Sequence, residues 1–238
     1  MMSSPVIKWS SGLVVQTGPA LCLGVLVVSL VLSACGSKLP KLRQQLNDPD
    51  PDKRIAAIEA LTIAKDTASV LRIGELLQDS VPDVRKEAAA GLGLIGDSRA
   101  CQPLADLFGI EQREEIQGAA VRSLVHIGTP SVQPLIGLLR SPRPAVRSGA
   151  AHALGKLQAR DAVYPLIRLL RDSDRNVRMG AVYALRQIGD KRGLDAIATS
   201  VQDTDQEVER AAERALSGEG YQEQLNKAKR KIRQLPYP

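Results

Sequence analysis

The stretch from Val177 to Leu185, Val-Arg-Met-Gly-Ala-Val-Tyr-Ala-Leu, decides the fold because its pattern recurs along most of the chain. Val84 and Val146 open the same pattern: an Arg comes next, then an Ala three residues after the Arg and a Leu seven after it. The anchor position recurs at spacings of 31, 32, 30, 31 and 31 residues. The anchors of units one to six are Arg54, Arg85, Gln117, Arg147, Arg178 and Glu209. A period in this range predicts a solenoid, in which each unit buries its apolar face by stacking on its neighbours.

Two columns, numbered by their distance after the anchor, keep their residue type in every unit. Column three is Ala57, Ala88, Ala120, Ala150, Ala181 and Ala212, and column seven is Leu61, Leu92, Leu124, Leu154, Leu185 and Leu216. In unit two, the residues from Val84 to Ile95 form one apolar stripe of a helix that Gly96 ends, and a second apolar run reaches Phe108. We therefore predict an all-α fold, an α-solenoid of about five and a half helix pairs over residues 41–217.

This motif (Asp, Val-Arg, Ala-Ala, Leu-Gly, Gly-Asp, Leu-Leu) resembles the HEAT-like repeats of phycobilisome lyase subunits and of deoxyhypusine hydroxylase. The resemblance covers roughly residues 42–217, about three quarters of the chain. It implies a stack of HEAT-like helix pairs, but it says little about function because such repeats serve many partners.

An acidic column lies six residues before the anchor. Its members are Asp48, Asp79, Asp172 and Asp203, with Glu111 and Ser141 at the matching positions. In a structural role these side chains cap free amides at the turn or pair with the next Arg. The alternative is that the Arg column forms a ladder for binding anions.

The first 40 residues do not fit the repeat. Leu21 to Leu32 is an apolar run of about a dozen residues, which suits the core of a signal peptide and is short for a membrane span. The run leads into Leu32-Ser33-Ala34-Cys35-Gly36, which resembles a bacterial lipobox. We predict a lipoprotein signal peptide at 1–34, lipidation of Cys35 and a short tether at 35–40. An ordinary signal peptide or an uncleaved anchor remains the alternative.

Lipidation at Cys35 would place the solenoid at a bacterial cell membrane or outer membrane, facing the periplasm or the exterior. In lipoproteins of bacteria with two membranes, a non-acidic residue such as Gly36 resembles an outer-membrane sorting signal. Three acyl chains exceed what stable anchoring requires. The short tether would keep the repeats near the bilayer.

Composition argues against some functions. The net charge is only +6 and aromatic residues make up 3% of the chain, so neither a nucleic-acid footprint nor a base-stacking platform is expected. With Cys35 acylated and Cys22 in the signal peptide, Cys101 would be the only thiol left, which predicts a small buried residue rather than a disulfide.

Catalytic motifs are equally scarce. The resemblance to deoxyhypusine hydroxylase would require His-Glu pairs to hold two irons, but His126 and His152 are followed by Ile127 and Ala153. Two histidines alone make a poor metal site. We predict no catalytic residue, no metal and no cofactor. A bilin lyase or chaperone-like subunit is the alternative that rests on the resemblance alone, and a secretion signal counts against it.

Columns five and nine vary in every unit and point away from the helix seam. From them and their neighbours we predict a partner-binding surface for an acidic protein segment. Its residues are Arg122, His126, His152, Lys156, Tyr183, Arg186, Gln187 and Arg214. Tyr and Arg are favoured at interface hot spots. A merely solvated helix face remains the alternative.

The basic tail at 218–238 carries apolar residues near helical spacing, from Leu225 to Leu235. It is expected to form a helix that caps the last unit, or to contact anionic lipid or the acidic partner. Together these features predict a membrane-anchored scaffold or adaptor that holds another protein near the envelope. A structural stabiliser of an envelope complex is a third interpretation.

Overall fold

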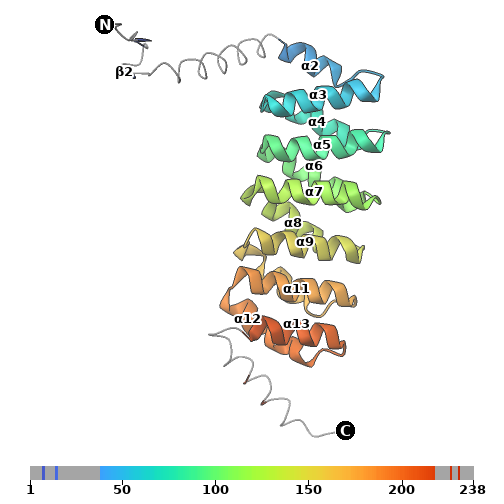
Figure 1. Ribbon diagram of the computed structural model, residues 1–238. Coiled ribbons are helices and arrows are strands. Elements are labelled where there is room, and N and C mark those ends of the chain that lie inside the picture. The colour runs from blue at the N-terminus through green and yellow to red at the C-terminus, as the bar shows by residue number, and fades with distance from the viewer. Residues whose placement is uncertain (1–6, 9–13, 16–37, 218–225, 227–229, 231–238) are drawn as a thin grey trace, which may run out of the picture.

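A computed structural model of the chain describes residues 7–8, 14–15, 38–217, 226 and 230. Within this part, twelve α-helices stack into one elongated solenoid (Figure 1). They are α2 (Leu39–Gln45), α3 (Pro51–Ile63), α4 (Val70–Glu75), α5 (Pro82–Ile95), α6 (Cys101–Ile110), α7 (Glu114–Ile127), α8 (Val132–Leu138), α9 (Pro144–Lys156), α10 (Val163–Leu169), α11 (Arg175–Ile188), α12 (Lys191–Ile197) and α13 (Gln206–Leu216). The predicted all-α solenoid is confirmed, with about six helix pairs.

Short 3-10 helices extend or precede the helices of one layer. They are η1 (Thr67–Ser69), η2 (Leu76–Gln78), η3 (Ser98–Ala100), η4 (Thr129–Ser131), η5 (Arg160–Ala162) and η6 (Ala198–Gln202). Before the solenoid, β1 (Ile7–Lys8) and β2 (Val14–Val15) pair antiparallel, with Ile7 opposite Val15.

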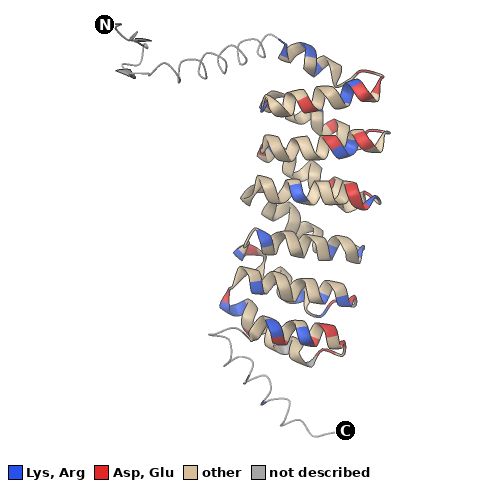
Figure 2. Ribbon diagram, viewed as in Figure 1, with Lys and Arg blue, Asp and Glu red and all other residues tan. Residues whose placement is uncertain are grey.

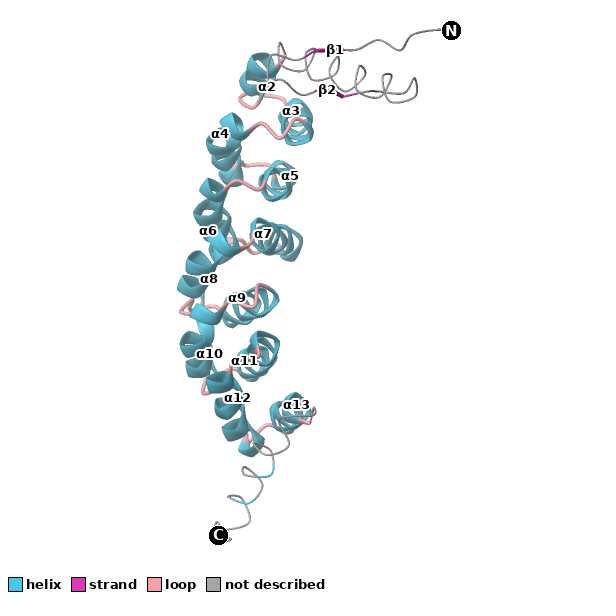
Figure 3. Cartoon of the chain, turned by 90° about the vertical axis from the view of Figure 1, so that its left-hand side faces the viewer, coloured by secondary structure: helices cyan, strands magenta, loops and turns pink. Residues whose placement is uncertain are grey.

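The helices form two curved layers (Figure 3). The Val-Arg helices, α3, α5, α7, α9, α11 and α13, line the concave side, and α2, α4, α6, α8, α10 and α12 form the convex side. The curvature therefore turns one face of every Val-Arg helix toward a shared hollow side. Residues far apart in sequence but equivalent in the repeat come to lie in rows along that side.

Local signals set the ends of the inner helices. Pro51, Pro82 and Pro144 occupy the first turn of α3, α5 and α9, where a missing N–H costs nothing. At the start of α11 the Asp174 side chain accepts hydrogen bonds from two backbone amides. Gly96 ends α5 with a left-handed φ of 82°, as the sequence predicted.

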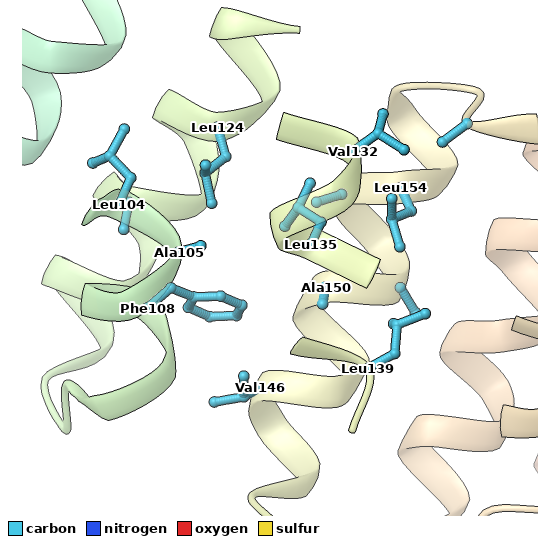
Figure 4. Packing of buried hydrophobic residues seen from close by; sticks show 14 of the residues in the cluster. Leu104, Ala105, Phe108, Leu124, Val132, Leu135, Leu139, Val146, Ala150 and Leu154 are labelled. Atoms are coloured by element: carbon cyan, nitrogen blue, oxygen red, sulfur yellow. The ribbon is translucent and has the colours of Figure 1, made fainter. Parts of the chain in front are cut away.

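The conserved columns form the core. No Ala of column three and no Leu of column seven is more than 1% exposed. Burying each Leu side chain contributes about 2 kcal/mol. Figure 4 shows Leu104 and Phe108 of α6 among these residues, and Phe108 is 3% exposed. Gly149 of α9 leaves room for its ring, because a Cβ there would come 2.7 Å from the Phe108 Cζ.

Small residues let the inner helices approach one another closely. A Cβ added at Gly93 of α5 would lie 2.7 Å from the Ser123 Cα of α7, and one added at Gly155 of α9 would lie 2.9 Å from the Ala184 Cα of α11. Ser123 Oγ donates a hydrogen bond of 2.8 Å to the Ala89 carbonyl across the first of these contacts. The spacing between neighbouring units is therefore fixed by residues that have almost no side chain.

The two ends of the solenoid differ from the predicted domain limits in one respect. Leu39 and Pro40, assigned to the tether, form the first turn of α2, since Pro is well suited to that turn. Cys35 and almost all of the predicted signal peptide and basic tail lie outside the described residues. Among the helices that are described, none is long and apolar enough to cross a bilayer.

Candidate partner-binding surface

The inner face consists of columns five and nine of the Val-Arg helices. These positions lie on the opposite side of each helix from the buried Val, Ala and Leu columns, because an α-helix turns by about 100° per residue. Of the predicted residues, the exposed ones are Arg122, His126, His152, Lys156, Tyr183, Gln187 and Arg214. The structure thus brings them onto one concave side, as their place in the repeat predicted, while their role in binding stays a prediction.

Arg186 differs from the other predicted residues. It occupies column eight, is only half-buried and already takes part in an interaction within the chain. Tyr183, one turn earlier on α11, is 44% exposed. An aromatic side chain and a partly engaged guanidinium therefore lie on the same helix, and Tyr183 is the more accessible of the two.

The chemistry of the inner face changes along the solenoid. From unit three onward columns five and nine carry Arg122, Lys156 and Arg214 together with both histidines. In units one and two the same columns carry Glu59, Ile63, Ala90 and Leu94. Figure 2 shows the accompanying asymmetry of charge, with acidic residues gathered at one end of α3, α5 and α7. These acidic ends are the N-terminal turns of the helices, where Asp and Glu are favoured.

The Arg and Asp columns neutralise each other. Each Arg pairs with the acidic residue 25 or 26 positions later, in the next unit. The pairs are Arg54–Asp79 at 2.8 Å, Arg85–Glu111 at 2.9 Å, Arg147–Asp172 at 2.7 Å and Arg178–Asp203 at 2.8 Å. Each Arg also donates to the backbone carbonyl six residues before it. These contacts favour the structural role over an anion-binding ladder.

The Arg147–Asp172 pair shows why the ladder is structural. The two side chains are only 13% and 9% exposed. Burial by itself raises the pKa of the Asp172 carboxyl, but hydrogen bonds from Arg147 and from the Asp174 amide outweigh burial and hold that pKa below its ordinary value. The carboxylate therefore stays charged and stitches unit four to unit five.

Unit three interrupts this ladder. Gln117 replaces the Arg and Ser141 replaces the acidic residue, so no ion pair joins these two positions. Arg143 takes over part of the role, since its Nη1 donates to the carbonyls of Glu111 at 2.7 Å and Gly109 at 3.2 Å. The inner face changes character at this same unit.

Two shallow pockets lie elsewhere on the surface. One, of about 280 Å³, lies on the convex side between α4 and α6 and includes Leu71, Pro103 and Ile110. The other, of about 310 Å³, includes Asp83, Glu114 and Glu115 at the start of α5 and α7. Sequence reasoning did not predict either pocket, because each depends on how two neighbouring units stack.

No metal or nucleophile site emerges from the part of the chain that the structure describes. Within it, no three His, Cys, Asp or Glu side chains are grouped to hold a metal ion. Cys101 begins α6 with 3% exposure, and its Sγ lies 3.3 Å from the Ser131 Oγ. This placement matches the small buried residue predicted for Cys101.

Stacked helix pairs with an exposed, variable concave face define an α-solenoid repeat protein. A family model of HEAT repeats matches residues 39–125 and 132–217, which is well over half of the chain. The chain therefore belongs to the HEAT-repeat family. None of the curated proteins compared with it matches.

Solved structures show the same fold at low sequence identity. A chain from a structural study of microtubule plus-end tracking by XMAP215, CLIP-170 and EB1 is 17% identical with a TM-score of 0.57, over 79% of this chain and 89% of that one. Human deoxyhypusine hydroxylase is 20% identical with a TM-score of 0.44, over 87% and 100%. A designed armadillo repeat protein in complex with the peptide (KR)4 is 22% identical with a TM-score of 0.43, over 76% and 98%.

Proposed function

We propose that this HEAT-repeat chain is a membrane-anchored scaffold that binds an acidic segment of a partner protein on its inner face. The observation that carries the proposal is the contrast within the repeat. The columns that build the core keep their residue type, whereas the exposed concave columns change in every unit and gather cations from unit three onward. A face kept free of the stacking contacts can vary to suit a partner.

The residue types on this face suit the recognition of carboxylates. Arg122 offers a planar guanidinium that can bind a carboxylate through two hydrogen bonds, and Lys156 adds a flexible point charge. Tyr183 supplies rigid contact area with a polar end. All three are exposed and come from α7, α9 and α11, so an extended segment running along the solenoid would meet them in turn.

We expect the triple substitution Arg122→Ala, Lys156→Ala, Tyr183→Ala to weaken binding of an acidic peptide at least tenfold, about 1.4 kcal/mol. The probe is a fluorescein-labelled peptide with Glu at every third position. Its dissociation constant would be measured by fluorescence anisotropy against the full-length chain in phosphatidylcholine nanodiscs. Because charge attracts the peptide, raising the salt concentration should also weaken its binding to the natural chain.

A matched control exists on the convex side. Tyr164, Arg168 and Lys191, on α10 and α12, are also exposed and have the same residue types. Replacing these three by Ala should leave the dissociation constant unchanged. Equal loss in both triple variants would mean that the peptide senses net charge alone, and the proposed surface would be wrong.

The membrane half of the proposal rests on the lipobox-like sequence at Cys35 and places the protein at a bacterial cell membrane or outer membrane. We expect a radiolabelled fatty acid to label the natural chain in bacteria and to be lost completely in Cys35→Ala. Cys22→Ala, which changes a cysteine inside the apolar run, should keep the label. Unlabelled natural protein found in the cytosol would contradict the anchor and give priority to a lyase-type function.

A further inference from the structure

Two large aliphatic side chains lie exposed at one end of the inner face. Ile63 is 83% exposed and Leu94 is 51% exposed. Both occupy column nine, at the ends of α3 and α5 in neighbouring units. The Lys65 ammonium group donates a hydrogen bond to the Leu94 carbonyl, so the two helix ends are tied together. The two side chains therefore belong to one small apolar patch.

The surroundings of this patch do not favour an acidic ligand. In units one and two, columns five and nine carry no cation, and column five of unit one is Glu59. Burial, and then the negative charge of Glu59, raise the pKa of the nearby Glu87 carboxyl. Two carboxyl groups that repel one another would repel a third from a partner.

The opposite holds two units further along. Arg122, His126, His152 and Lys156 are all exposed on α7 and α9. The inner face is thus apolar and slightly acidic over units one and two, and basic from unit three onward. A uniformly acidic segment would complement only the second part.

We infer that the inner face recognises a two-part segment of a partner protein, with aliphatic residues that cover Ile63 and Leu94 and acidic residues that meet Arg122 and Lys156. This inference rests on the proposed function and adds the chemistry and the polarity of the ligand. The apolar end of the segment lies over units one and two, nearest the N-terminus of the solenoid. Complementary charge fixes the other end over units three to five.

The repeat sets the spacing of such a ligand. Packed helices lie about 10 Å apart, and an extended chain advances about 3.3 Å per residue. Consecutive units would therefore be met by every third residue of the segment. The matching probe has Leu at positions one and four, Glu at positions seven, ten and thirteen, and Ser elsewhere. A second probe has Ser in place of both Leu.

The test measures the anisotropy of both labelled peptides with the full-length chain in phosphatidylcholine nanodiscs. For the double variant Ile63→Ser, Leu94→Ser we expect about tenfold weaker binding of the Leu-containing peptide, from the loss of two apolar contacts. Binding of the Ser-containing peptide should not change. The control is Leu71→Ser, Ile110→Ser, which alters two aliphatics on the convex side that are 60% and 69% exposed; it should leave both peptides unaffected.

The outcomes separate this inference from the function beneath it. Equal affinity of the natural chain for the two peptides, or an equal loss in the convex control, would overturn the two-part ligand while leaving the basic surface in place. If the substitutions at Arg122, Lys156 and Tyr183 weaken neither peptide, the proposed function itself is wrong. Circular dichroism of each variant shows that the solenoid is still folded, since all four aliphatic side chains lie outside the core.

Discussion

Replacing Gly93 by valine is expected to cause the largest loss of stability of any single substitution considered for this chain. A Cβ at this position would lie 2.4 Å from the Cβ and 2.7 Å from the Cα of Ser123, so α5 and α7 would have to separate. Overpacking a tight core costs about 1–3 kcal/mol. A clash with backbone belongs at the upper end, so we expect a loss of about 3 kcal/mol and a melting temperature about 6–12 °C lower.

Thermal unfolding followed by far-ultraviolet circular dichroism measures this effect, and Gly137 provides the control. A Cβ at Gly137 of α8 meets nothing within 4 Å. Alanine there should therefore leave the melting temperature unchanged or raise it, because Ala favours a helix over Gly by about 1 kcal/mol. If Gly93→Val melts with the natural chain, close approach of the inner helices does not set the spacing between units.

Arg147→Ala is expected to have the second largest effect, a loss of about 3 kcal/mol in the free energy of unfolding. The substitution would leave the Asp172 carboxylate, 9% exposed, without its cation and without two hydrogen bonds of 2.8 and 2.7 Å. Removing one partner of a buried ion pair costs about 3–5 kcal/mol, and the slight exposure of this pair places it at the low end. Chemical denaturation at neutral pH measures the change.

Acidification distinguishes a lost ion pair from a general packing defect. Because the folded-state pKa of Asp172 is lowered, its pair stabilises the natural chain above the ordinary pKa of Asp, about 3.9. That stability is lost as the pH falls through the folded-state pKa. The difference between the natural chain and Arg147→Ala should therefore shrink below about pH 4. The control Lys86→Ala, whose 3.4 Å pair with Glu115 is well exposed, should cost less than about 1 kcal/mol.

The sequence predicted the candidate surface better than it predicted the state of each residue on it. Helical spacing was enough to place Arg122 and His152 on the outside, because a column opposite to a buried column must face away from the core. It could not show that Arg186 is partly engaged within the chain. It also did not show that Ile63 and Leu94 are exposed neighbours of the basic residues, since an aliphatic residue near the end of a helix is as often buried as exposed.

Lys65 and Gln158 illustrate a second limit. Both adopt a left-handed backbone, with φ of 51° and 50°, at the place in the repeat where Gly96 and Gly189 stand in other units. The helices α3 and α9 end there even though no glycine signals the end. The stacked neighbours must hold these residues in that conformation, because it costs an ordinary residue roughly 1–2 kcal/mol.

By itself, the sequence determined the period, the helix pair and the residues of the core. These follow from local rules: apolar residues that recur at helical spacing must share a face, and a unit that cannot bury that face alone must stack. Only the tertiary structure decided that Arg147 pairs with Asp172 in the next unit, that Gly93 sets the spacing of α5 and α7, and that the inner face changes from apolar to basic at unit three. Each of these depends on how two units meet, and the distance between units is a property of packing rather than of any one stretch of sequence.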